Sequence, residues 1–136
     1  METDYKFYLS LENSLCRDYV TEKYFSMMRY NVVPVVMSSP LDSHSLLSPS
    51  HSFIDALHFP SVGKLAKYLH QLAANDTLYN EYFWWKPHFQ VHSSEQDVNR
   101  GMCHLCAELH SNDQPKIYAN MTDWWDSSAG CRSVHA

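Results

Sequence analysis

The chain has 136 residues, of which 45% are hydrophobic and 18% charged, and its formal net charge is -5. This length suits one domain with a core of its own, and the composition is that of a globular protein. Ten Lys and Arg in such a chain form no basic stripe, so nucleic acid is excluded as an expected partner. The N-terminus has no basic start before an apolar run, and no stretch is long enough to span a bilayer, so we expect neither signal nor anchor here.

Two apolar runs near the N-terminus predict strands at residues 5–11 and 32–37. The first alternates and is rich in aromatic residues, whereas the second is continuously apolar and β-branched, as a strand buried on both faces should be. Between them, residues 19–29 contain no Gly or Pro and follow Asp18, a candidate N-cap, so they predict a helix. The order predicts a parallel βαβ unit and an α/β fold.

Polar residues follow the first predicted strand, where open α/β sheets bind ligands at the carboxyl ends of their strands. Glu12, Asn13 and Ser14 lie at that point. In the predicted helix, Tyr19, Glu22 and Lys23 share one face by their i, i+3, i+4 spacing.

This helix face has side chains suited to a nucleotide. The charge of Lys23 suits a phosphate, the carboxylate of Glu22 suits ribose hydroxyls, and Tyr19 offers a ring face. Spacing alone also fits ordinary solvated helix charges, and the chain has no Gly-rich phosphate loop. Both interpretations stay open at this point.

The rest of the chain predicts a loop, a strand and helices. Residues 38–52 are rich in Ser and Pro and predict a loop, and residues 53–56 predict a short strand. Ser61 is a candidate N-cap for an amphipathic helix through Ala74, whose apolar stripe consists of Val62, Leu65, Leu69 and Leu72. Residues 78–86 predict a further helix, with aromatic side chains that favour core packing over a sugar-stacking surface.

Longer motifs give a family resemblance. The N-terminal region reads YKFYLSLENSLCRDYVTEK, and VPVV, LAKYLHQL, YNEYFWWK, CHLC and IYANMTDWW follow in order. This pattern resembles the α1,3-fucosyltransferases, whose motif is a strand ending in F-E-N-S followed by D-Y-[VI]-T-E-K. The resemblance covers nearly the whole chain and implies the Rossmann-like C-terminal lobe of a GT-B glycosyltransferase. We expect a partial donor-binding α/β lobe at residues 1–90 and a helical, aromatic tail of the same lobe at residues 91–136.

The resemblance implies a donor site for GDP-fucose. Residue by residue, the family's donor-binding positions correspond to Asn13, Tyr19, Glu22 and Lys23, and Glu12 and Ser14 belong to the same motif. Lys23 would neutralise the diphosphate, Glu22 would hold the ribose, and Asn13 would reach phosphate or sugar. GT-B enzymes do not need a DxD metal motif, and this chain has none, so we expect no metal site and no required cofactor.

The function implied is transfer of L-fucose from GDP-fucose to N-acetylglucosamine of a glycan, either the core of an N-glycan or a Lewis-type antenna. The resemblance places the general base and the acceptor-binding lobe upstream of Met1, so no catalytic residue is assigned within the chain. It also implies the lumenal side of the Golgi membrane, with a membrane anchor that this chain lacks. The alternatives are a non-catalytic nucleotide-sugar-binding remnant and a fragment that associates with an intact fucosyltransferase.

Four positions depart from the family pattern. Ser38 replaces a usual Gly, His44 a usual Tyr, and Leu57 and His58 a usual acidic pair. Neutral drift in a surface loop and damage to donor binding are both open. If the missing Gly had a positive φ, Ser38 would strain the turn.

Cysteines and sequons complete the predictions. For Cys103 and Cys106, a disulfide, a redox site and a zinc half-site compete. A second CxxC is missing and the pair lies late in the chain, which favours the disulfide. The resemblance implies the same pairing. Because the four Cys include only one close pair, we expect Cys16 to be buried or free. Asn75 and Asn120 begin glycosylation sequons.

Overall fold

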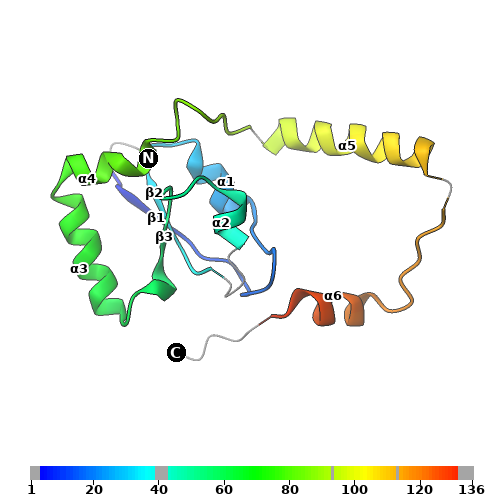
Figure 1. The fold of residues 1–136 in the computed structure, drawn as a ribbon, viewed down its shortest axis with the longest axis horizontal. Helices are drawn as coiled ribbons and strands as arrows, with labels where there is room; N and C mark the ends of the chain where they lie inside the picture. The colour runs from blue at the N-terminus through cyan, green and yellow to red at the C-terminus, as the bar shows by residue number, and fades with distance from the viewer. Residues whose placement is uncertain (1–3, 39–42, 93, 113, 132–136) are drawn as a thin grey trace.

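The structure is a computed structural model that describes residues 4–38, 43–92, 94–112 and 114–131. In this part of the chain, a parallel sheet contains the strands β1 (Phe7–Ser10), β2 (Val33–Val36) and β3 (Ile54–Asp55), in the order β1-β2-β3 (Figure 1). The helix α1 (Glu22–Met28) connects β1 to β2. The predicted α/β class and the βαβ unit are therefore confirmed.

The central strand explains the apolar run in the sequence. All residues of β2 are buried, because β1 and β3 flank it and side chains cover both of its faces. Phe7 pairs with Val33 and Ser10 with Val36, which sets the carboxyl ends of β1 and β2 side by side. The loops that follow these strands therefore start at the same edge of the sheet.

The start of α1 differs from the prediction. The helix begins at Glu22 rather than at residue 19, and its N-cap is Thr21, whose hydroxyl accepts a hydrogen bond from the Lys23 backbone N–H. Asp18 has φ of 55°, in the left-handed region where Asp is tolerated, and does not cap the helix. Tyr19 therefore lies in the preceding loop and does not share a helix face with Glu22 and Lys23.

The middle of the chain adds short helices around the sheet. A helix α2 (Ser43–Leu47) lies within the stretch that was predicted to be loop, where five residues without Gly or Pro form little more than one turn. The 3₁₀ helix η1 (Ala56–His58) follows β3, and Asp55 caps it by accepting from the Leu57 backbone N–H at 2.9 Å.

The amphipathic helix α3 (Val62–Ala73) is confirmed, with Ser61 as its N-cap. Leu72 is buried, and Leu65 and Leu69 pack at the core margin. Val62 was wrongly assigned to the core stripe: it is the first residue of α3 and is 83% exposed.

The aromatic segment after α3 forms α4 (Asp76–Asn80) and a 3₁₀ helix η2 (Glu81–Phe83) instead of one helix at residues 78–86. Its role in the core is confirmed, since Tyr79, Tyr82 and Trp85 are buried. The Tyr79 hydroxyl donates to the carbonyls of Lys6 and Asn31, at 2.7 and 3.0 Å, and burial raises its pKa to about 12.

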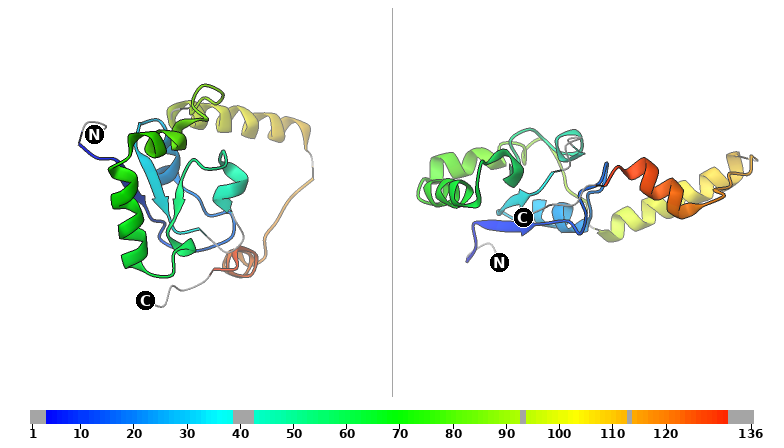
Figure 2. Two further views of the ribbon diagram at one scale, coloured as in Figure 1. Left: turned by 60° about the vertical axis from the view of Figure 1, so that its left-hand side comes forward. Right: turned by 90° about the horizontal axis from the view of Figure 1, so that it is seen from below.

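Two helices follow this core in the chain. Figure 1 shows α5 (Ser94–Ser111) and α6 (Met121–Ala129) on the far side of α1 from α3, and Figure 2 shows the same separation from two further directions. Among the described residues, no helix is both long and apolar enough to cross a membrane. The end of α6 returns to the sheet's carboxyl edge, where Cys131 forms a disulfide with Cys16.

Candidate functional site

A buried carboxylate joins the end of the first strand to the start of the first helix. The Glu12 carboxylate accepts from the Thr21 backbone N–H and from the Thr21 hydroxyl, both at 2.7 Å. Only 2% of the Glu12 side chain is exposed, so the structure encloses this charge while Thr21 satisfies it. Glu12 thereby fixes the loop that bears the rest of the motif, and it acts as a positioning residue.

The ammonium group of Lys23 sits over the same carboxylate. Its Nζ donates to Asn13 Oδ1 at 2.7 Å and lies 3.8 Å from Glu12 Oε2, while a third of the side chain remains exposed. An ammonium has three donors, so it can bind another acceptor while Asn13 keeps its contact. The structure thus brings Glu12, Asn13 and Lys23 together at the carboxyl edge of the sheet.

The other predicted site residues lie around this cluster. Ser14 is exposed in the loop, and the ring of Tyr19 meets the ring of Trp125 edge to face, with centroids 6.2 Å apart. Glu22 is exposed and lines a cavity of about 240 Å³ with Thr21, Ser26, Arg29 and His92, among others. Glu22 and Lys23 are adjacent in the helix, yet Glu22 lines this cavity while Lys23 turns to Glu12 and Asn13.

Two of the departures from the family pattern contact each other. Ser38 Oγ and His44 Nδ1 are 3.1 Å apart, and both side chains are buried. Ser38 also donates its backbone N–H to Asp55 Oδ1 at 3.3 Å, which connects the loop after β2 to the end of β3. Ser38 has no positive φ, so the strain considered for a Gly replacement does not arise. Leu57 and His58 are exposed in η1, and His58 Nδ1 lies 3.7 Å from Asp55 Oδ2.

His44 is held neutral by its surroundings. Burial lowers the pKa of its imidazole, and the charges of Glu12 and Asp55 offset part of that decrease. Its ring packs edge to face on Tyr24, with centroids 5.0 Å apart, and Nε2 has no hydrogen-bond partner among the described residues. The His44 ring therefore lies between Tyr24 of α1, Phe53 and Ser38, the residue that follows β2 closely.

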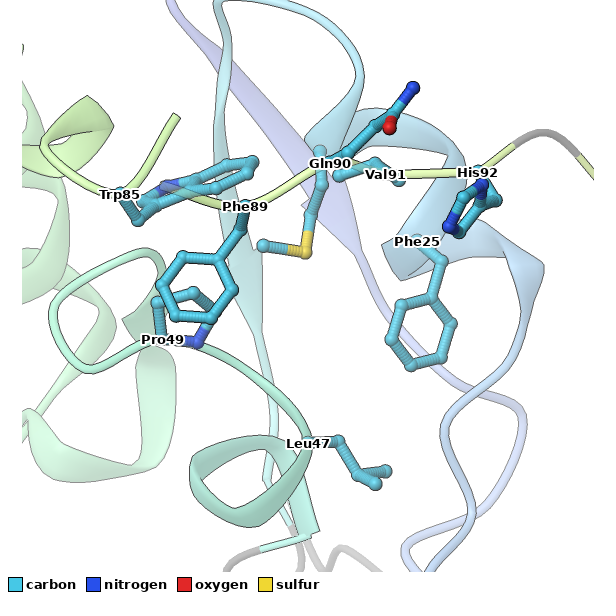
Figure 3. A pocket seen from close by; sticks show the side chains of 9 residues that line it. Phe25, Leu47, Pro49, Trp85, Phe89, Gln90, Val91 and His92 are labelled. Carbon is cyan, nitrogen blue, oxygen red and sulfur yellow. The ribbon is translucent and has the colours of Figure 1, made fainter. Parts of the chain in front are cut away.

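An apolar groove adjoins the cavity lined by Glu22, with which it shares Phe25 and His92. Figure 3 shows side chains from α1, from the end of α2 and from the segment after η2 around a cavity of about 260 Å³. Phe25, Met28, Trp85, Phe89 and Val91 are among its lining residues. A diphosphate needs cationic or N–H donors, and this groove has no Lys or Arg in its lining.

The cysteine pairing differs from the prediction. Cys16 and Cys131 form a disulfide, whereas Cys103 and Cys106 are exposed free thiols. The predicted Cys103–Cys106 bond is absent because both residues lie in the continuous helix α5. Residues three apart in a helix have Cβ atoms about 5–6 Å apart, whereas a disulfide needs about 3.5–4.5 Å.

The two sequon asparagines serve as helix N-caps. Asn75 Oδ1 accepts from the backbone N–H groups of Thr77 and Leu78, and Asn120 Oδ1 does the same for Thr122 and Asp123. Both side chains are exposed, and glycosylation at either stays a prediction. No cluster of three or more metal-ligating side chains occurs within the described ranges.

Sequence reasoning missed two residues that shape this site. Thr21 is both the N-cap of α1 and the hydrogen-bond partner of Glu12. Because Thr is a preferred N-cap residue, its position before Glu22 and Lys23 could have predicted the start of the helix. Trp125 packs against Tyr19 from more than a hundred residues away, and no local pattern indicates that contact.

Comparison with known proteins gives the family. Residues 1–124 match the model for "Glycosyltransferase family 10 (fucosyltransferase) C-term". The chain is 40% identical over 136 residues to "Alpha-(1,3)-fucosyltransferase C" of Drosophila melanogaster, with 98% of this chain and 30% of that protein covered. It is 38% identical to "Glycoprotein 3-alpha-L-fucosyltransferase A" of the same fly, with 96% of this chain and 26% of that protein covered.

A mammalian relative is more distant. The mouse "4-galactosyl-N-acetylglucosaminide 3-alpha-L-fucosyltransferase 9" is 34% identical over 120 residues, with 88% of this chain and 33% of that protein covered. The chain thus spans about a third or less of the length of these relatives. Because the family model matches residues 1–124, well over half of the chain, the chain belongs to glycosyltransferase family 10, the fucosyltransferases, and corresponds to their C-terminal region.

Proposed function

We propose that this chain is the donor-binding lobe of an α1,3-fucosyltransferase and binds GDP-fucose at the carboxyl edge of its sheet. The observation that supports this most is the cluster of Glu12, Asn13 and Lys23, in which a buried carboxylate and an amide fix an ammonium that still has a donor to offer. A fixed ammonium at the usual ligand edge of an α/β sheet suits a nucleoside diphosphate.

Each motif residue has a distinct proposed role. Lys23 binds the diphosphate, and Asn13, already in contact with its Nζ, binds an adjoining phosphate or fucose oxygen. Glu22 lines a cavity next to the start of α1, and its carboxylate accepts from ribose hydroxyls. Tyr19 offers its ring and hydroxyl from the preceding loop. Glu12 and Ser14 belong to the same loop, with Glu12 acting through Lys23 and Thr21.

The proposed reaction is an inverting transfer to a hydroxyl of N-acetylglucosamine in a glycan. It needs a base for the acceptor hydroxyl and positive charge for the leaving diphosphate. Lys23 supplies the positive charge for the leaving diphosphate. The base and the acceptor contacts are assigned to the part of the relatives that this chain does not match. No metal or cofactor is required in this scheme. The proposed location is the lumenal side of the Golgi membrane.

Binding of GDP to the Lys23→Ala variant tests the donor site. Loss of a charged hydrogen bond costs about 1.5–3 kcal/mol, so the variant should bind GDP about 10- to 150-fold more weakly in isothermal titration calorimetry. Lys64→Ala is the matched control, because Lys64 is an exposed lysine on α3 and should leave the affinity unchanged. Equal affinity of wild type and Lys23→Ala for GDP, or no binding by wild type, would contradict the proposed function.

A further inference from the structure

The C-terminal segment, residues 121–131, touches the loop that bears the donor motif at three points. Cys131 forms a disulfide with Cys16, and the Arg17 backbone N–H donates to the Ala129 carbonyl at 2.6 Å. The ring of Trp125 lies edge to face with that of Tyr19. These contacts join segments more than a hundred residues apart, and together they cover Cys16 and Ala129 from solvent.

The sequence shapes the segment so that Cys131 reaches the loop. Asn120 caps the start of α6, and the helix ends at Ala129 before Gly130, which has φ of 53°. Left-handed backbone of this kind ends a helix and turns the chain, and glycine adopts it without steric cost. A Cβ at Gly130 would meet no atom within 4 Å, so this glycine is needed for its backbone conformation alone.

The loop depends on restraints from outside itself. Hydrogen bonds between Glu12 and Thr21 join the two ends of the loop. These bonds do not restrain the residues between the two ends, which need other contacts. The middle of the loop, at Cys16, Arg17 and Tyr19, is where the C-terminal segment binds. A loop with both ends and its middle restrained loses less conformational freedom when a ligand binds.

We propose that the C-terminal segment is part of the donor site, and that Trp125 and the Cys16–Cys131 disulfide hold Tyr19 and its loop in the geometry that binds the nucleotide. Trp125 is a positioning residue that acts through Tyr19, and the disulfide does the same through Cys16. This inference rests on the proposed function, since it assigns Tyr19 to the GDP-fucose site. It adds a second region of the chain, absent from the donor motif, to that site.

The first test is the cysteine pairing. Non-reduced peptide mapping by mass spectrometry of the secreted chain should find a peptide pair linked through Cys16 and Cys131. Cys103 and Cys106 should both be alkylated without reduction, because they are exposed thiols in a continuous helix. A bond between Cys103 and Cys106 with Cys131 alkylated would overturn the disulfide part of the proposal.

The second test measures GDP affinity in five variants of the whole chain. Trp125→Ala and Cys131→Ser should weaken GDP binding about tenfold, as when the binding-competent loop falls to a tenth of its population. The matched controls are Trp84→Ala, a half-exposed tryptophan outside the C-terminal segment whose indole N–H donates to the Ser50 carbonyl, and Cys103→Ser, an exposed thiol. Both controls should bind like wild type, and Trp125→Phe should restore most of the affinity because it keeps an aromatic ring.

Amide hydrogen exchange without nucleotide separates this inference from the proposed function. Residues 13–20 should exchange faster in Trp125→Ala and Cys131→Ser than in wild type, while the β2 amides should keep their protection. If wild type binds no GDP, the proposed function fails together with the donor role of the segment. If Lys23→Ala weakens GDP binding but Trp125→Ala and Cys131→Ser do not, the inference alone is overturned, whatever the exchange shows.

Discussion

The 136-residue chain, incubated with GDP-fucose and N-acetylglucosamine-terminated or core N-glycan acceptors, is expected to form no fucosylated product by mass spectrometry. A base must lie within hydrogen-bond reach of the acceptor hydroxyl, and proton transfer is worth about 10²–10⁴-fold in rate. The buried carboxylates at the site are already committed: Glu12 accepts from Thr21, and Asp55 from the backbone N–H groups of Ser38 and Leu57.

The chain is also expected to lose rate because nothing in its described part orients the acceptor. Holding two reactants in place contributes up to about 7–11 kcal/mol, and the described residues offer no second lobe to hold a glycan. A full-length member of the family under the same conditions serves as the positive control. Product from the 136-residue chain at a comparable rate would place the base within residues 1–136, and Glu12→Gln would then be the first variant to make.

Trp85→Ala should lower the free energy of unfolding by about 3–5 kcal/mol, measured by urea denaturation. Trp85 is 3% exposed, packs in a cluster with Tyr24, Met28 and Val36, and donates its indole N–H to the Tyr82 carbonyl at 3.0 Å. Figure 3 shows its ring beside the apolar groove, where truncation would leave a cavity next to α1.

The neighbouring tryptophan is the control for this prediction. Trp84 is 45% exposed and donates its indole N–H to the Ser50 carbonyl at 2.8 Å. Trp84→Ala should lower the free energy of unfolding by about 1 kcal/mol, because it removes one exposed hydrogen bond and a partly buried side chain. Equal losses for both variants would show that the aromatic segment does not anchor the core as described.

The strands could be predicted because their signal is local. The β-branched run at Val33–Val36 is apolar on both faces, and a parallel strand buried between neighbours requires that pattern. The start of α1 could not be settled locally, since Asp18 and Thr21 are both good N-cap residues. Glu12 decides between them by binding Thr21 across the loop, a contact that depends on how strand and helix pack.

The sequence indicated which residues belong to the motif, but it did not indicate which of them lie in contact. Lys23 and Asn13 are in contact, whereas Tyr19 lies outside the helix and packs on Trp125. The Cys16–Cys131 disulfide joins residues 115 positions apart, and sequence spacing favoured the closer pair instead. Likewise, Ser38 and His44 looked like separate departures from the family pattern until the structure placed them in contact.

The measurement that tests the donor site most directly is amide chemical-shift mapping of the isotope-labelled chain during titration with GDP-fucose. We expect the largest changes at Asn13, at Tyr19 and at the start of α1 around Lys23, with little change in α3. Changes concentrated in the apolar groove at Met28, Trp85 and Val91, with the amides around Lys23 unmoved, would contradict the proposed donor site.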